Sequence, residues 1–205
     1  MNFGFTFSGK KIRAVSKANV SRVFAAGLLL ALAACGGGPA PTTYDLSAPS
    51  AGIKSRLSGQ IVIATPTALQ ALSDQKIVVR DTTGAISFLG GGQWADQLPN
   101  LLQARLINTF ENASKLRAVA LPSSGAMADY QLVTDVRSFY VVTPGNEAVV
   151  ELSVRLINAR SGQIVKGRVF SARRPVGDSV NAGSAAVALD DALSSVLLEI
   201  VRWVG

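Results

Sequence analysis

The sole cysteine of this 205-residue chain, Cys35, ends an apolar run that follows a basic leader. The leader contains five lysines and arginines and no acidic residue. The apolar run, VFAAGLLLALAA at residues 23–34, is shorter than the roughly 20 residues that span a bilayer, but it has the usual length for a secretory signal. We therefore expect residues 1–34 to be a removable signal peptide, so that only the remainder folds.

The four residues that end at the cysteine, Leu32-Ala33-Ala34-Cys35, resemble the lipobox of bacterial lipoproteins. The resemblance implies cleavage before Cys35, a diacylglycerol on its sulfur and usually a third chain on the freed amino group. Two or more acyl chains give stable anchoring, whereas one gives marginal binding. In enteric bacteria an aspartate at the next position favours the inner membrane. Gly36 stands there instead, which favours the inner leaflet of the outer membrane, facing the periplasm. An ordinary signal with an incidental cysteine is the alternative.

The leader also accounts for most of the basic charge. The whole chain carries a net charge of +7. Loss of residues 1–34 removes five of its 20 basic residues and none of its 13 acidic ones, which leaves +2. A strongly basic chain would suggest a nucleic-acid partner. Because the basicity belongs to the leader, we expect no nucleic-acid binding, and contact with the membrane through acylated Cys35.

Residues 35–43 are expected to be the lipidated cysteine and a tether. The sequence GGGPAPTT at residues 36–43 is too poor in apolar side chains to form a core, and it is typical of a spacer between a membrane and a domain. From residue 44 to residue 205 the composition is that of one domain, and no repeat is evident. The sequence therefore predicts a single domain on a tether.

Two segments have the three- and four-residue spacing of apolar residues that predicts an amphipathic helix. The first spans residues 97–114, and Pro99 fits its first turn, where a missing N–H costs nothing. The second spans residues 184–204, with Gly183 before it. These two helices are expected to cover one side of a sheet.

Six strands are predicted by β-branched or alternating runs, at residues 60–64, 77–80, 85–89, 130–142, 149–158 and 164–172. The glycine run at 90–92 is expected to be a flexible connection from the third strand to the first helix. Tight turns between the last three strands predict an antiparallel meander. The expected fold class is α+β, with a single mainly antiparallel sheet covered by two helices in the order β-β-β-α-β-β-β-α.

The sequence contains few of the residue types and motifs on which enzymatic catalysis depends. The chain has no histidine, which removes serine-histidine and cysteine-histidine catalysis and most zinc sites. It also has no phosphate-binding GxxxxGK[ST] motif. Its carboxylates are scattered, although catalysis by carboxylates alone is an alternative. We expect no enzymatic activity, no catalytic residue, no cofactor and no metal site.

Three residues are candidates for contact with a partner. Arg137 and Arg155 lie on neighbouring predicted strands and could project together toward an acidic partner or a phospholipid headgroup. The ordinary solvated face of a sheet is the alternative. Trp94 precedes the first helix and is a candidate anchor, because tryptophan is enriched in binding hot spots. Its alternative is a place at the edge of the core. The basic character continues at Lys166, Arg168, Arg173 and Arg174.

Several loose motifs recur in a recognisable order after the tether. They are YDLS at residues 44–47, QWADQL at 93–98 leading into LxxxLxxxF, and VRLINARSG at 154–162. Over residues 43–203 this order resembles the ABC-type transport auxiliary lipoproteins, the family of paraquat-inducible protein C. The resemblance implies a non-enzymatic envelope component of a transporter with MCE domains, which moves phospholipids or other hydrophobic molecules between two membranes. The permease, the ATPase and the MCE protein would be separate chains.

The leading hypothesis is therefore a periplasmic subunit that docks such a transporter to the outer membrane. The first alternative is an envelope lipid-binding carrier or sensor that needs no transporter and holds its ligand between the sheet and the helices. The second is an envelope hydrolase. A homo-oligomer is a further expectation, because an exposed sheet face favours self-association and a ring-shaped partner favours a matching ring.

Overall fold

The structure is a computed structural model that describes residues 1, 4, 40–53, 59–114, 119–125 and 127–205. The lipobox with Cys35 and almost all of the predicted signal peptide lie outside the described residues. Contacts divide the chain into Met1–Ala40 and Pro41–Gly205. The fold described below is that of the second unit alone.

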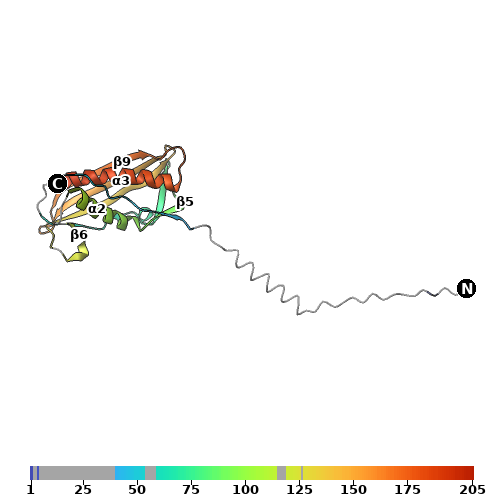
Figure 1. Ribbon diagram of the computed structural model, residues 1–205, viewed down its shortest axis with the longest axis horizontal. Coiled ribbons are helices and arrows are strands. Elements are labelled where there is room, and N and C mark those ends of the chain that lie inside the picture. The colour runs from blue at the N-terminus through green and yellow to red at the C-terminus, as the bar shows by residue number, and fades with distance from the viewer. Residues whose placement is uncertain (2–3, 5–39, 54–58, 115–118, 126) are drawn as a thin grey trace. The chain divides into compact units, whose positions relative to one another are not determined.

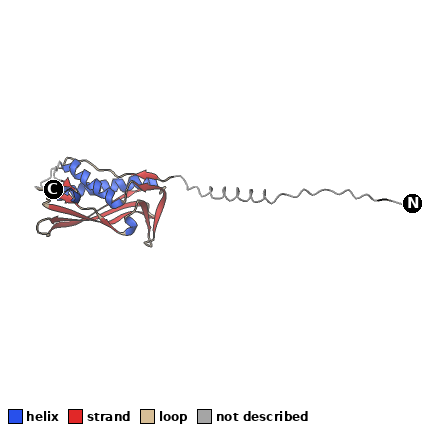
Figure 2. Ribbon diagram, turned by 90° about the horizontal axis from the view of Figure 1, so that it is seen from below, coloured by secondary structure: helices blue, strands red, loops and turns tan. Residues whose placement is uncertain are grey.

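This unit has a sheet on one side and two helices on the other (Figure 2). The elements before the first helix are β1 (Thr42–Tyr44), β2 (Ile61–Ile63), β3 (Thr67–Ala68), the 3-10 turn η1 (Gln70–Leu72), β4 (Lys76–Asp81) and β5 (Ile86–Trp94). The remainder are α2 (Leu98–Ser114), β6 (Val119–Ala120), the 3-10 turn η2 (Pro122–Ser124), β7 (Tyr130–Thr143), β8 (Glu147–Asn158), β9 (Ile164–Pro175) and α3 (Ala182–Val204). Figure 1 shows α3 lying along the sheet beside β9.

Strand β7 organises the sheet. One of its edges pairs antiparallel with β8 along almost its full length, and β8 pairs antiparallel with β9. The other edge pairs in parallel with β2, then β3, then β4. The sheet continues from β4 to β5 in antiparallel pairing, from β5 to β1 in parallel, and from β2 to β6 in parallel. Three short segments from the first half of the chain thus share one long strand of the second half.

The structure confirms the α+β class, the two helices and the C-terminal meander, and it corrects the expected sheet. Among the described residues the sheet has nine strands and is mixed, with five parallel and three antiparallel pairings. The mainly antiparallel sheet and the strand order were therefore wrong. The additional strands β1, β3 and β6 have two or three residues each, too few to show any periodicity.

The glycine run at 90–92 belongs to strand β5, so its expected role as a flexible connection is wrong. Gly92 lies opposite Thr42 of β1 and beneath the start of α3. A Cβ atom at Gly92 would lie 2.5 Å from the Cβ of Ala182 and 2.7 Å from Cε2 of Tyr44. Gly91 has φ of +78°, which favours glycine. Close packing thus explains Gly92 and the backbone angle explains Gly91.

Helix α3 begins two residues earlier than expected, and its N-terminal cap explains why it begins there. The side-chain oxygen of Asn181 accepts a hydrogen bond from the N–H of Ser184 at 3.0 Å. In return, the hydroxyl of Ser184 accepts from the N–H of Asn181 at 3.1 Å. This reciprocal capping box satisfies two donors that the helix itself leaves unpaired.

One hydrophobic core fills the space between the sheet and the helices. Alternate residues of β8 point into it, because successive side chains of a strand lie on opposite faces. Its fully buried members include Leu102, Leu106 and Phe110 of α2, Val150, Leu152, Val154 and Leu156 of β8, and Leu189, Leu193, Val196, Leu197 and Ile200 of α3. These side chains occupy the space that a ligand between the two layers would need.

The turn between β4 and β5 is closed by Asp81. Its Oδ1 accepts hydrogen bonds from the hydroxyl of Thr83 at 2.7 Å and from the N–H groups of Thr83 and Ala85 at 2.8 Å each. The Thr83 hydroxyl, followed by the Ala85 N–H, lowers the pKa of Asp81 from its ordinary value of 3.8, because both stabilise the charged carboxylate.

An NMR titration of the Asp81 carboxyl carbon should therefore give a midpoint below 3.8. Since the pKa is lower in the folded state, the stabilisation is complete above the unfolded pKa and is lost as the pH falls through the folded value. Thr83→Ala should raise the midpoint. An unchanged midpoint in that variant would show that the hydroxyl is not the main cause.

Candidate interaction surfaces

The chain that enters the domain after the expected tether is fixed to both helices. The carboxylate oxygens of Asp45 each accept from Nη2 of Arg105 on α2 at 2.6 Å. The N–H of Ser47 donates to Oδ1 of Asp190 on α3, also at 2.6 Å. Between them, Leu46 is buried with 3% of its surface exposed. We call residues 44–47 with these two helix partners the tether clamp.

Strand β1 holds the first residue of the clamp against the sheet. The carbonyl of Tyr44 accepts from the N–H of Ala95 at 2.8 Å, and Tyr44 pairs with Trp94 in the parallel β1–β5 ladder. The Tyr44 ring lies close to the start of α3, where a Cβ on Gly183 would be 3.2 Å from its hydroxyl oxygen. The clamp therefore joins β5, α2 and the N-terminal half of α3.

The Asp45–Arg105 ion pair should contribute measurably to stability. The Arg105 side chain is only 19% exposed, although that of Asp45 is 59% exposed, so solvent screens the pair only in part. In a double-mutant cycle with Asp45→Asn and Arg105→Met, urea unfolding should give a coupling free energy of about 0.5–1 kcal/mol. The Asp129–Arg160 pair is the control, because Arg160 is 83% exposed, and its coupling should be smaller. Equal coupling in both pairs would contradict the special role of the clamp.

Arg137 and Arg155 lie on β7 and β8 as expected, but each faces a carboxylate of the same sheet. Nε of Arg137 lies 3.1 Å from Oε1 of Glu151, and Nη2 of Arg155 lies 2.6 Å from Oδ2 of Asp135. Arg155 alternates along β8 with side chains that point into the core, so it lies on the face away from the helices. Opposite charges thus alternate on this face, as on an ordinary solvated sheet.

Trp94 lies in the core. Only 1% of its surface is exposed, and its ring packs edge-on against Phe139 at a centroid distance of 5.7 Å. The indole is therefore not part of the surface that the domain presents. This burial agrees with the alternative that Trp94 closes the edge of the core.

The sheet face away from the helices also has a shallow pocket that the sequence did not indicate. It has a volume of about 200 Å³ and lies between η1 and the β4–β5 turn. Leu69 and Ile86 line it and are 72% and 49% exposed. Arg80 donates from its guanidinium to the hydroxyl of Tyr140 at 3.1 Å within the same pocket. The exposed apolar side chains make this a candidate contact surface.

The described part of the chain contains no group of three or more histidine, cysteine, aspartate or glutamate side chains that could hold a metal ion. No helix within the described ranges has the length and apolar character needed to cross a membrane. Cys35 lies outside these ranges, so its lipidation stays a prediction from sequence. The absence of enzymatic activity likewise stays a prediction.

Proteins of similar sequence and of similar structure are known. An uncharacterized protein of Bradyrhizobium diazoefficiens is 35% identical over 186 residues, which cover 86% of this chain and 49% of that protein. The chain thus spans about half the length of this relative. The crystal structure of a DUF330-family protein from Xanthomonas campestris has a TM-score of 0.73 at 29% identity, over 79% of this chain and 93% of that one. A second crystal structure, of an uncharacterized protein, shares the fold, with a TM-score of 0.63 at 15% identity over 82% of this chain and 100% of that one.

A match to a defined family covers most of the folded unit. Residues 44–201 match the family described as ABC-type transport auxiliary lipoprotein component. The matched region begins at the first residue of the tether clamp and extends into the last turn of α3. The chain therefore belongs to the family of ABC-type transport auxiliary lipoproteins.

Proposed function

We propose that the protein is the lipid-anchored, periplasm-facing subunit that docks an MCE-type ABC transporter to the outer membrane. Family membership supports the link to an ABC transporter. The observation that carries the docking role is the tether clamp. The segment that follows the predicted tether is held by both helices and the sheet, so the point at which the chain enters the domain is fixed.

The clamp also fixes where the chain enters the domain. Its contacts with α3 are at Gly183 and Asp190, in the N-terminal half of a helix of 23 residues, which corresponds to a length of about 34 Å. The C-terminal end of α3 is thus about 20 Å along the helix from Asp190, and Figure 1 shows the C-terminus and β5 at opposite ends of the domain. A partner could bind there or on the outer sheet face without displacing the clamp.

The alternative of a lipid carrier or sensor is less well supported in its original form. The space between the sheet and the helices, where the ligand was expected, is filled by the hydrophobic core. A docking subunit needs no such cavity. We propose that the transported molecule, a phospholipid or another hydrophobic molecule, is handled by the MCE protein with its separate permease and ATPase.

Affinity purification of the tagged lipoprotein from crosslinked envelopes tests this proposal. We expect an MCE-domain protein to co-purify, together with its permease and ATPase. Cys35→Ala in the same cells is the control, and it should reduce recovery because the protein is no longer held at the membrane. A clean purification of the wild-type protein that contains no MCE-domain protein would reject the docking role.

Self-association belongs to the same proposal. Strand β9 pairs only with β8 among the described strands, so one edge of the sheet is open, and such edges favour pairing with another chain. Light scattering on the acyl-free protein, alone at high concentration and mixed with the MCE-domain partner, should detect an oligomer. A monomer under both conditions would reject this expectation.

A further inference from the structure

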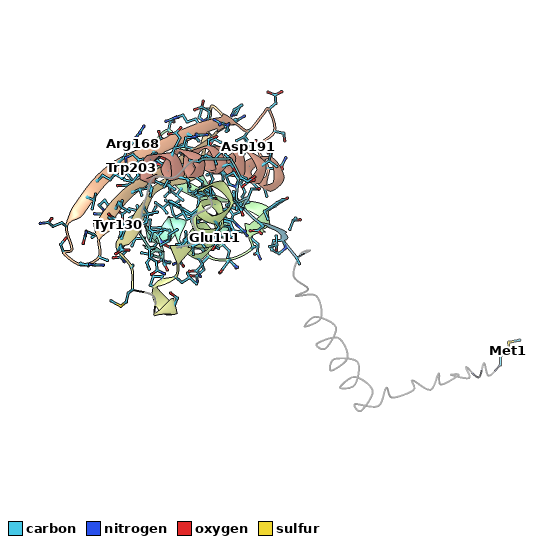
Figure 3. The ribbon with its side chains drawn as sticks, turned by 60° about the vertical axis from the view of Figure 1, so that its left-hand side comes forward. Met1, Glu111, Tyr130, Arg168, Asp191 and Trp203 are labelled. Atoms are coloured by element: carbon cyan, nitrogen blue, oxygen red, sulfur yellow. The ribbon has the colours of Figure 1, made fainter. Side chains whose placement is uncertain are left out.

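An open pocket of about 370 Å³ lies where the last turns of α3 meet β9. Its walls are the side chains of Arg168, Glu199, Arg202 and Trp203. Arg168 and Trp203 are adjacent at this end of the domain in Figure 3. The pocket is separate from the tether clamp and from the outer sheet face, and it lies at the end of α3 that the clamp leaves free.

Contacts between β9 and α3 hold the apolar wall of the pocket in place. Nζ of Lys166 donates to the carbonyl oxygens of Trp203 at 2.6 Å and Val204 at 3.3 Å, so a cation occupies the carbonyl end of the helix, where it is favoured. The Trp203 ring packs edge-on against Phe170 at 5.5 Å. The guanidinium of Arg168 lies 5.0 Å from the Phe170 ring centre. The indole, Lys166 and Arg168 are therefore positioned before any ligand binds.

The two arginines of the pocket differ from most others in the domain. Within the described ranges, Arg168 and Arg202 form no ion pair, and the only acidic side chain lining the pocket is Glu199. Both arginines are exposed. Ion pairs with carboxylates are formed instead by Arg105, Arg137, Arg155, Arg160 and Arg173. At this pocket two arginines thus lie beside a single carboxylate, and neither forms an ion pair with it.

An aromatic side chain lies among these cations. Trp203 lines the pocket together with Arg168 and Arg202, and Nζ of Lys166 lies 4.9 Å from the centre of its ring. Tryptophan beside lysine and arginine is a combination found where proteins meet the headgroup layer of a membrane. An acidic peptide would use the guanidinium groups but would gain little from the indole.

We propose that this pocket binds the phosphate group of an anionic phospholipid. The guanidinium groups of Arg168 and Arg202 donate to the phosphate oxygens, for which their planar arrangement of N–H groups is well suited. Trp203 packs against the glycerol region next to the phosphate. The biological setting of this lipid rests on the proposed transport function, but the binding itself does not.

Vesicle binding tests the pocket directly. The domain of residues 41–205 contains the whole core and every described strand and helix, and a cooperative thermal transition would verify its folding. It should co-sediment with vesicles of phosphatidylcholine and phosphatidylglycerol (3:1) much more than with phosphatidylcholine alone. Arg168→Ala/Arg202→Ala should weaken this binding about 20- to 30-fold, since each basic side chain at an anionic surface strengthens binding about fivefold.

The matched control removes the same charge from paired arginines. Arg137→Ala/Arg173→Ala should change vesicle binding by less than about threefold, because both side chains already face carboxylates. Acrylamide quenching gives a second readout. Anionic vesicles should protect Trp203, while Trp94 is buried and contributes little to the change.

Three results would overturn the proposal. Equal losses in the two double variants would mean that only net charge matters, and equal binding to both kinds of vesicle would exclude recognition of an anionic lipid. Complete displacement from vesicles by inorganic phosphate at low millimolar concentration would identify a free-phosphate site instead. Co-purification with an MCE-domain protein could still succeed in each case, so failure here is distinguishable from failure of the docking role.

Discussion

Cys35→Ala is expected to move the protein from the membrane fraction to the soluble periplasmic fraction. Without the sulfur no diacylglycerol can be attached, and no helix within the described ranges could cross the membrane in its place. The variant retains Ala33 and Ala34 before the substituted position, and small residues of this kind are where ordinary signal peptides are cleaved, so the exported chain should be released from its signal peptide. Fractionation with immunoblotting, and incorporation of labelled palmitate, measure the two consequences separately.

The matched control is Gly36→Ala, which changes the neighbouring residue and keeps the thiol. This variant should remain in the membrane fraction and should still take up palmitate. If Cys35→Ala also remained there at the wild-type level, the lipid anchor would be rejected, and the family assignment would then lack its expected mode of attachment.

Trp94→Ala should be among the most destabilising single substitutions in the domain. The indole is 1% exposed and fills the space beside Phe139. Truncation removes its burial and leaves a cavity, so we expect a loss of about 3–5 kcal/mol in the free energy of unfolding. For a domain of this size, the Tm should fall by about 10 °C. Urea denaturation and calorimetry on the same domain provide the measurements.

Two further variants show whether the loss comes from the cavity. Trp94→Phe keeps part of the aromatic contact and should lose less than half as much. Val187→Ala on α3 should change the stability by less than about 0.5 kcal/mol, since Val187 is 64% exposed. A stable Trp94→Ala variant that loses partner binding would instead return Trp94 to the contact surface.

The buried faces of the main strands and helices could be predicted from the sequence, whereas the pairing partners of several strands could not. Periodicity indicates which side of a strand or helix is buried, and this placed both helices and the β7–β9 meander correctly. It carries no information about which distant strand pairs at an edge. The parallel pairing of Thr67 with Asp135 or of Thr42 with Gly92 depends on the whole fold. Strands of two or three residues offer no pattern to read.

For the candidate surfaces, too, some residues could be predicted from the sequence, whereas their partners in space could not. Arg137 and Arg155 were identified as sheet residues, but their carboxylate partners depend on strand register, which the sequence did not reveal. Arg105 was not identified, because its partner Asp45 is 60 residues away in the chain. The pocket around Trp203 depends on how α3 packs on β9. The alternating basic residues Lys166 and Arg168 on β9 were the one signal that pointed there.

The shared edge of β7 has a consequence for how the chain folds. Its partners Ile61, Thr67 and Val79 precede their paired residues by more than 60 positions. Contacts so distant in sequence form slowly, because a long loop must close before any pairing stabilises it. The first half of the domain has no β7 to pair with until the second half has emerged. We therefore expect a chain with this topology to fold slowly, a property that suits the export predicted from its leader.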